Sequence, residues 1–291
     1  MEKHTEITGT TRLVCLLGSP VSHSISPSMH NASFQKLGLD YAYLAFDVNE
    51  KNFKHAVEGL IALNAAGWNC TMPLKRLMYE RCDTLSDAAR LSGAVNTVVN
   101  QNGLLFGDNT DGYGFMQSMR DAGISCSGKK AVLLGSGGAA AAILAQAALD
   151  GTQEIAVFSR SASESTRLME EEAGKIRCQC SCSITLFDLA DEAALKKQLL
   201  DSEILINASS VGMAPREDAC LISDPSWLHP ELSVGDVIYN PRQTRLLSLA
   251  AAQGCRTFNG LYMLLHQGAK AFFDWTGQEM PVEYIRELYF R

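Results

Sequence analysis

The sequence lacks any apolar run long enough to cross a membrane. A transmembrane helix needs about 18 to 20 apolar residues in succession, and the longest such stretch, residues 139–149, fits one buried helix. The first six residues are polar and are not followed by the apolar core of a secretory signal peptide. We therefore expect a cytoplasmic protein with no membrane partner.

Positive charge is also in short supply. The 291 residues include 25 lysines and arginines against 32 acidic residues, which gives a net charge of −7. This balance argues against a nucleic-acid-binding surface. Apolar residues make up 46% of the chain and charged residues 20%, a composition typical of globular proteins with a sizeable core. The length favours two domains.

Nine cysteines are present, and without a secretion signal they indicate reduced thiols rather than disulfides. Three of them alternate within residues 178–182, a spacing that fits either a metal site or one face of a β-strand. Because Ile184 and Leu186 continue the alternation, we interpret these cysteines as small apolar residues on a strand. We predict no metal site.

The first third of the chain mixes strand and helix patterns. The expected strands are residues 12–18, 41–48, 67–72 and 95–100, and the expected helices are residues 27–37 and 52–63. A further strand at 104–107 is expected to form a hairpin with 95–100 across Gln101-Asn102-Gly103.

From residue 112 onward, strand and helix patterns alternate. The expected strands are residues 131–134, 154–159, 183–187 and 204–207, with helices that include 112–122 and 164–173. Such alternation implies parallel strands joined by right-handed crossovers. The last thirty residues carry aromatic residues at helical spacing.

These patterns predict an α/β fold of two α/β domains. We place an N-terminal, substrate-binding catalytic domain at residues 1–111 and a Rossmann-like dinucleotide-binding domain at 112–259. The C-terminal helices, residues 260–291, are expected to return to the first domain.

The segment 135–140, Gly-Ser-Gly-Gly-Ala-Ala, follows a predicted strand and opens an alanine-rich helix. That context is what the dinucleotide-binding fingerprint requires. Gly135 allows a tight turn, the next two glycines permit close approach to a pyrophosphate, and the helix N-terminus offers free N–H groups. Ala140 replaces the usual third glycine, which is a tolerated change. The predicted cofactor-binding residues are Gly135, Ser136, Gly137, Gly138 and Ala139.

The end of the next predicted strand carries no acidic residue. An NAD enzyme usually has an aspartate or glutamate there for the ribose 2′-hydroxyl. Here Arg160 stands between Ser159 and Ser161, and a guanidinium pairs bidentately with phosphate. We therefore expect NADP to be preferred over NAD. The alternative is that Arg160 is a solvated surface residue.

Two residues are candidates for proton transfer. Lys75 follows a predicted strand and the Met72-Pro73 turn, and Asp111 lies in the segment 107–112. A lysine beside an aspartate can move a proton to or from a hydroxyl or carbonyl oxygen. Taken alone, each residue would be interpreted as an ordinary surface lysine or turn aspartate.

A series of short motifs occurs in order along nearly the whole chain. They are G-x-P-x-x-H-S-x-S-P-x-x-H-N from Gly18, T-M-P-L-K from Thr71, G-A-V-N-T from Gly93, N-T-D-G from Asn109, G-x-G-G-A from Gly135, N-A-S from Asn207, Y-N-P from Tyr239 and G-x-x-M-x-x-x-Q from Gly260. Together they resemble the shikimate dehydrogenase family, which includes the quinate/shikimate dehydrogenases. The resemblance implies reversible NADP- or NAD-linked reduction of 3-dehydroshikimate to shikimate in aromatic amino-acid biosynthesis.

The resemblance also implies roles for the matching residues. Lys75 would be the catalytic acid/base, with Asp111 as its partner and as a substrate ligand. Ser24 and Ser26 would bind the substrate carboxylate. The remaining implied contacts are Thr71, Asn96 and Gln267 to the ring hydroxyls, Tyr239 to the substrate at the nicotinamide end, and Val237, Gly260 and Met263 to the cofactor.

Other functions stay open at this point. One is an NAD-linked quinate/shikimate dehydrogenase of quinate catabolism, because residues 275–277 and 281–284 resemble that branch, whereas Thr71 and Leu74 resemble the biosynthetic one. Another is a non-catalytic, shikimate-binding sensor, whose expected mark is loss of the lysine or the aspartate; both are present. The chain is expected to act as a monomer or homodimer.

Overall fold

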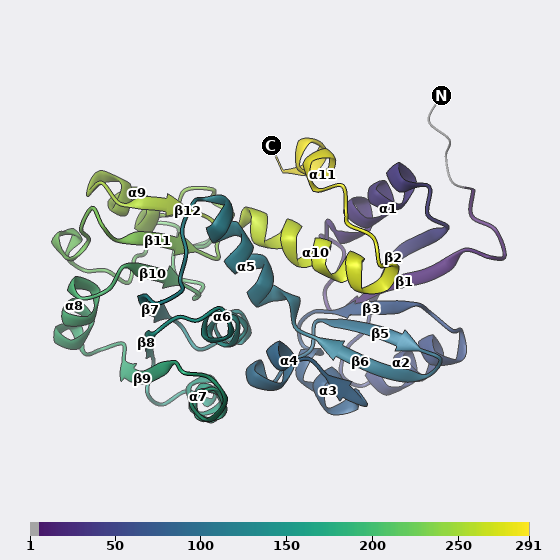
Figure 1. Cartoon of the computed structure of the whole chain (residues 1–291), viewed down its shortest axis with the longest axis horizontal. Helices are drawn as coiled ribbons and strands as arrows, with labels where there is room; N and C mark the ends of the chain where they lie inside the picture. The colour runs from purple at the N-terminus through teal and green to yellow at the C-terminus, as the bar shows by residue number, and fades with distance from the viewer. Residues whose placement is uncertain (1–5, 291) are drawn as a thin grey trace. The chain divides into compact units, whose positions relative to one another are not determined.

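The computed structural model describes residues 6–290 and divides into two compact units (Figure 1). The first unit comprises Met1–Thr110 and Leu265–Arg291, and the second comprises Asp111–Leu264. The chain thus leaves the first unit, builds the second and comes back, and the predicted return of the C-terminal helices is confirmed. The second change of unit falls inside a helix rather than at the predicted residue 260.

The first unit is built on a six-stranded mixed sheet in the order β2-β1-β3-β5-β6-β4. Its strands are β1 (Arg12–Gly18), β2 (Tyr41–Asp47), β3 (Gly67–Cys70), β4 (Thr84–Leu85), β5 (Thr97–Gln101) and β6 (Leu104–Asp108). Its helices are α1 (Ser26–Leu37), α2 (Phe53–Ala62), α3 (Lys75–Arg81), α4 (Asp87–Ser92), most of α10 (Leu261–Thr276) and α11 (Val282–Tyr289). β1 pairs in parallel with β2 and β3, whereas β5 runs antiparallel to both β3 and β6.

Apolar side chains of the strands and helices form the core of this unit. Leu17, Trp68 and Val98 come from three neighbouring strands and are almost fully buried in one cluster. The predicted hairpin of β5 and β6 is confirmed, and Asn102 and Gly103 at its turn both have positive φ, as a two-residue type I′ loop requires.

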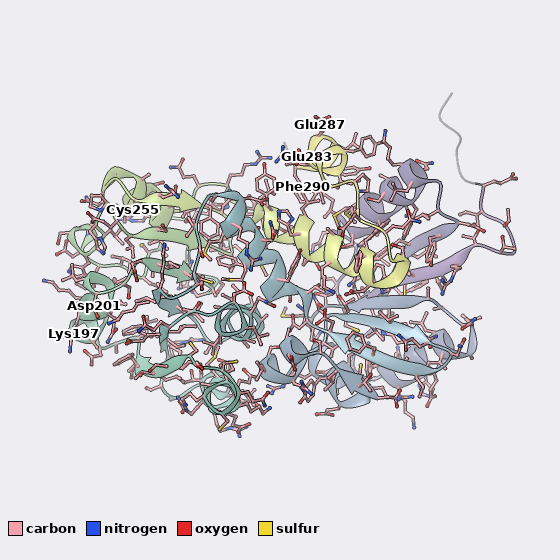
Figure 2. All side chains as sticks on the ribbon, viewed as in Figure 1. Lys197, Asp201, Cys255, Glu283, Glu287 and Phe290 are labelled. Carbon is pink, nitrogen blue, oxygen red and sulfur yellow. The ribbon has the colours of Figure 1, made fainter. Side chains whose placement is uncertain are left out.

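The C-terminal helix α11 buries only Ile285, while Glu283 and Glu287 project from it into solvent (Figure 2).

The second unit contains a six-stranded, wholly parallel sheet in the order β12-β11-β10-β7-β8-β9. Its strands are β7 (Lys130–Leu134), β8 (Glu154–Ser159), β9 (Ser183–Asp188), β10 (Ile204–Asn207), β11 (Ser233–Asp236) and β12 (Arg256–Phe258). Its helices are α5 (Thr110–Asp121), α6 (Gly138–Leu149), α7 (Glu164–Gln179), α8 (Glu192–Leu200), the 3-10 helix η1 (Pro225–Trp227) and α9 (Arg245–Ala252). This strand order is that of dinucleotide-binding folds, so the Rossmann-like prediction is confirmed.

The interpretation of the alternating cysteines is wrong. α7 runs to Gln179, so Cys178 lies exposed in its last turn, and β9 begins only at Ser183. The helical pattern of Met169, Ala173 and Ile176 extends farther than predicted. Within residues 6–290, no group of three or more histidines, cysteines or acidic residues is arranged to hold a metal. Nor does any helix in that range have the length and apolarity to cross a membrane.

Candidate active site

The sheet of the first unit brings several candidate residues to one edge. Leu16, Asn69, Thr97 and Asp108 form one row across β1, β3, β5 and β6. Because β5 is antiparallel to its neighbours, the edge that follows β1, β3 and β6 also precedes β5. The segments beyond that row contain Ser24, Ser26, Thr71, Lys75 and Asn96.

Thr71 and Lys75 are held through their backbones. The Thr71 N–H donates to the carbonyl of Leu17 at 2.9 Å, and the Lys75 carbonyl accepts from the Val95 N–H at 3.0 Å. Lys75 is half-buried and is the first residue of α3, a helix that the sequence patterns did not predict. β3 ends at Cys70, earlier than predicted, because Thr71 and Met72 belong to the turn that leads into α3.

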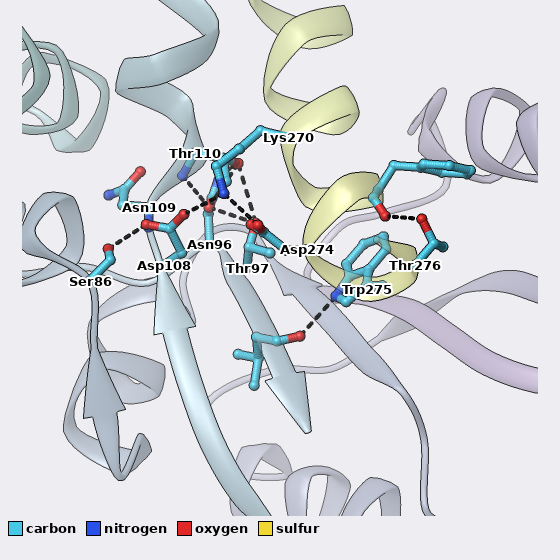
Figure 3. A network of polar contacts seen from close by, with 12 residues as sticks. Ser86, Asn96, Thr97, Asp108, Asn109, Thr110, Lys270, Asp274, Trp275 and Thr276 are labelled. Carbon is cyan, nitrogen blue, oxygen red and sulfur yellow. Dashed lines mark hydrogen bonds and ion pairs between the residues drawn. The ribbon is translucent and has the colours of Figure 1, made fainter. Parts of the chain in front are cut away.

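Asn96 is 3% exposed and is oriented by its neighbours (Figure 3). Its Oδ1 accepts from the Thr110 N–H at 2.8 Å and from the Thr97 hydroxyl at 3.0 Å. Its Nδ2 donates to Thr110 Oγ1 at 3.1 Å. The side chain is therefore fixed by the segment that leads directly into Asp111, which lies half-buried in the first turn of α5.

Ser24 and Ser26 lie where β1 gives way to α1. The Ser24 N–H donates to the Val21 carbonyl at 3.0 Å, and Ser24 Oγ accepts from the Ser26 N–H at 3.3 Å. Pro27 is in the first turn of α1, as predicted. Both hydroxyls are half-buried.

The His-Asn pair of the first motif has a structural role. Asn31 Nδ2 donates to the Tyr43 carbonyl at 2.9 Å and its Oδ1 accepts from the Tyr43 N–H at 2.8 Å, which fixes α1 to β2. His30 stacks on the Tyr43 ring at 4.5 Å, and its two ring nitrogens are buried without a hydrogen-bond partner among the described residues. Burial lowers the pKa of His30 to about 3, so the ring is neutral at physiological pH.

A partly buried cluster of charges connects α10 to the end of β6 (Figure 3). Lys270 Nζ pairs with Asp274 on the same helix and lies 3.5 Å from Asp108 Oδ2. Burial raises the pKa of Asp274 despite the adjacent ammonium. Burial alone would lower the pKa of Lys270, but its hydrogen bond and charge interaction with Asp274, together with Asp108, raise it. α10 also carries Gln267, half-buried.

In the second unit, the glycine turn lies at the point where the strand order reverses, between β7 and β10. Gly135 has φ +119°, and a Cβ atom there would lie 2.9 Å from the Ala208 carbonyl oxygen, so only glycine fits. Gly137 and Gly138 are exposed, with nothing within 4 Å of an added Cβ. α6 begins at Gly138 without a side-chain cap. These features fit the pyrophosphate of a dinucleotide.

Hydroxyl groups gather beside this turn. Ser136 Oγ lies 2.9 Å from Ser165 Oγ, and the Thr166 hydroxyl donates to Ser159 Oγ at 3.0 Å and to the Arg160 carbonyl at 2.9 Å. Ser159 is buried, whereas Arg160 and Ser161 are exposed. Sequence reasoning missed Ser165 and Thr166, although the serine- and threonine-rich run before α7 was a signal for them.

The other predicted cofactor residues of the second unit lie beyond β11. The Val237 N–H donates to the Asn207 carbonyl at 2.9 Å, and the Met263 N–H donates to the Gly260 carbonyl at 3.1 Å. A Cβ atom on Gly260 would collide with the Val237 carbonyl, so the structure brings these residues together. Tyr239 is 43% exposed nearby in the chain.

Family models match two parts of the chain. Residues 16–98 match the shikimate dehydrogenase substrate binding domain, and residues 260–288 match the shikimate 5'-dehydrogenase C-terminal domain. A curated relative from Listeria innocua, named shikimate dehydrogenase (NADP(+)), is 50% identical over 284 residues, which are 98% of this chain and 97% of the relative. The chain belongs to the shikimate dehydrogenase family.

Solved structures of this family agree with the assignment. Shikimate 5-dehydrogenase from Listeria monocytogenes, in complex with shikimate and NAD, is 50% identical, covers 97% of both chains and has a TM-score of 0.94. Quinate dehydrogenase from Corynebacterium glutamicum, in complex with NAD, is 28% identical, covers 96% of this chain and 99% of its own, and has a TM-score of 0.85. The family resemblance and the oxidoreductase class expected from the sequence are thereby confirmed.

Proposed function

We propose that the protein is a shikimate dehydrogenase that catalyses the reversible, NADPH-dependent reduction of 3-dehydroshikimate to shikimate in chorismate and aromatic amino-acid biosynthesis. The observation that carries this proposal is 50% identity, over 98% of the chain, to a relative of that name. The arrangement of polar residues at one edge of each sheet supports it.

Substrate recognition is assigned to the first unit, with Asp111 and Tyr239 from the second. Ser24 and Ser26 donate hydrogen bonds to the carboxylate of shikimate. The ring hydroxyls are bound by Thr71, Asn96 and Gln267. The fixed orientation of Asn96 supports this role, because a side chain that is already ordered loses little entropy when it binds.

The proton-transfer step is assigned to Lys75. When bound, NADPH supplies the hydride that reduces the ring ketone. As negative charge develops on the ketone oxygen, the Lys75 ammonium stabilises it and delivers a proton, and Asp111 as a carboxylate orients the ammonium. Such acid/base catalysis contributes about 10²- to 10⁴-fold in rate.

NADP is the proposed physiological cofactor. The uncapped N-terminus of α6 would hold the pyrophosphate, and Arg160 with Ser159 and Ser161 would hold the 2′-phosphate. The cofactor named for the Listeria innocua relative supports this choice. Val237, Gly260 and Met263 would line the nicotinamide end.

The deciding experiment is a matrix of initial rates that combines shikimate or quinate with NADP or NAD. We expect the highest kcat/KM with shikimate and NADP. A higher kcat/KM with quinate and NAD would instead favour the catabolic alternative. Tight shikimate binding without cofactor reduction would favour a sensor.

We expect the enzyme in the cytoplasm as a monomer or homodimer, with no nucleic-acid or membrane partner. Light scattering after size-exclusion chromatography distinguishes the two assembly states.

A further inference from the structure

Lys270 joins two elements of the first unit that lie far apart in the sequence. Its ammonium pairs with Asp274 on α10 and with Asp108 at the end of β6 (Figure 3). The three side chains are 31%, 12% and 11% exposed, respectively. The half-buried ammonium of Lys270 therefore interacts with two carboxylates whose charges are only weakly screened by water.

Asp108 connects this ion pair to Asn96. The Asp108 carbonyl accepts from the Asn96 N–H at 3.0 Å. Its Oδ1 accepts from the Ser86 hydroxyl and from the Asn109 N–H, the latter at 2.7 Å. These hydrogen bonds fix the position of Asp108. Thr110, two residues after Asp108, then binds the side chain of Asn96.

Gln267 lies on α10, the helix that also carries Lys270 and Asp274. Residues 267, 270 and 274 are spaced by three and four positions, so they share one face of the helix. The contact of Lys270 with Asp108 therefore sets the register of that face against the end of β6. A short path leads from Gln267 through Lys270 and Asp108 to Asn96.

We infer that Lys270 is a positioning residue that keeps Gln267 and Asn96 correctly spaced for the ring hydroxyls of shikimate. This inference rests on the proposed function, in which those two residues bind the ring. Without the ammonium, α10 loses its ionic contact with Asp108, and the two largely buried carboxylates lose this shared counter-ion, which also lowers stability.

The test compares Lys270→Met with the wild type. We expect the KM for shikimate to rise by about threefold to tenfold, the effect of weakening one or two hydrogen bonds, while the KM for NADP stays within about twofold and kcat changes less than the shikimate KM. Lys270→Arg keeps the charge and should recover part of the loss. The matched control is Lys54→Met, because Lys54 pairs with Glu58 on the exposed surface of α2.

A double variant, Lys270→Met/Asp274→Leu, separates positioning from stability. It also removes one of the two like charges, so the thermal midpoint should recover toward the wild-type value, while the shikimate KM stays raised because the ionic contact between Lys270 and Asp108 is still absent. Recovery of KM together with the midpoint, or an unchanged KM in both variants, would overturn the inference. If Lys270→Met does not fold, the double variant supplies the measurement. Wild-type protein that oxidises neither shikimate nor quinate would instead refute the proposed function.

Discussion

The backbone of Lys75 is hydrogen-bonded to a separate segment of the first unit. Its carbonyl accepts a hydrogen bond from Val95, and its neighbours Leu74 and Met78 are fully buried. Fixed backbone atoms limit where the flexible side chain can reach. This arrangement suits a group that must meet one oxygen atom of a substrate.

Replacing Lys75 should therefore affect the chemical step more than binding. We expect Lys75→Ala to lower kcat by about 10²- to 10⁴-fold with little change in the KM for shikimate, because the ammonium contributes mainly in the transition state. Steady-state kinetics of this variant beside Lys51→Ala, an exposed lysine on the same unit, measures the effect. An unchanged kcat would exclude Lys75 as the acid/base.

His30 should make stability depend on pH. Its folded pKa of about 3 lies below the ordinary 6.5, so between these values the unfolded chain binds more protons and the free energy of unfolding falls as pH falls. We expect His30→Phe to remove this slope, which amounts to about 2 kcal/mol between pH 6.5 and 5. Urea unfolding of wild type, His30→Phe and the exposed control His55→Phe at several pH values tests it. Parallel pH profiles for wild type and His30→Phe would contradict the assignment.

At the scale of elements, the junction of β8 with α7 provides the hydroxyl groups around the proposed 2′-phosphate site. Ser163 caps α7 by accepting from the Thr166 N–H, and Thr166 in turn contacts the end of β8. A helix N-terminus and an exposed arginine on this junction both favour an anion.

Arg160 should consequently discriminate between the cofactors. We expect Arg160→Ala to raise the KM for NADP by about tenfold to a hundredfold and to leave the KM for NAD nearly unchanged, because only NADP carries the phosphate that the guanidinium pairs with. The matched control is Arg167→Ala in α7, where the arginine already pairs with Glu171 at 2.8 Å. Equal effects on both cofactors would contradict this role.

Elements with clear periodicity could be predicted from the sequence, and short or unusual ones could not. Strand and helix alternation predicted β7 to β10 of the second unit and their parallel arrangement, whereas β11 and β12 were not predicted. By contrast, α3, β4 and α4 are two to seven residues long, too short for periodicity to develop. The alternating cysteines also mislead, because the end of a helix and the residues after it can mimic a strand pattern over five positions.

At the scale of the whole molecule, contacts between distant residues limited the prediction of the site. Lys270 and Asp274 look like an ordinary surface pair on a helix, since nothing in the sequence indicates that Asp108 approaches them. The motif residues were found because the family pattern singles them out. The Lys270 ion pair appears only once the chain has folded back on itself.

Trp275 shows how strongly the returning segment is attached. Its indole N–H donates to the Val98 carbonyl at 2.9 Å, across 177 residues of sequence. We expect Trp275→Phe to lower the free energy of unfolding by about 1 to 3 kcal/mol, because it leaves a buried acceptor without its donor. Chemical denaturation followed by circular dichroism measures this loss, and an unchanged midpoint would show that the bond contributes nothing.

The route of the chain has a consequence for biosynthesis on the ribosome. The second unit is one continuous stretch, so every residue it needs has been synthesised before the ribosome reaches the last helices. The first unit cannot fold completely until translation is nearly finished. Until then, the face that receives Trp275 stays uncovered. Newly made chains therefore pass through a period in which the nucleotide-binding half can be complete while the other half still depends on residues that have not yet emerged.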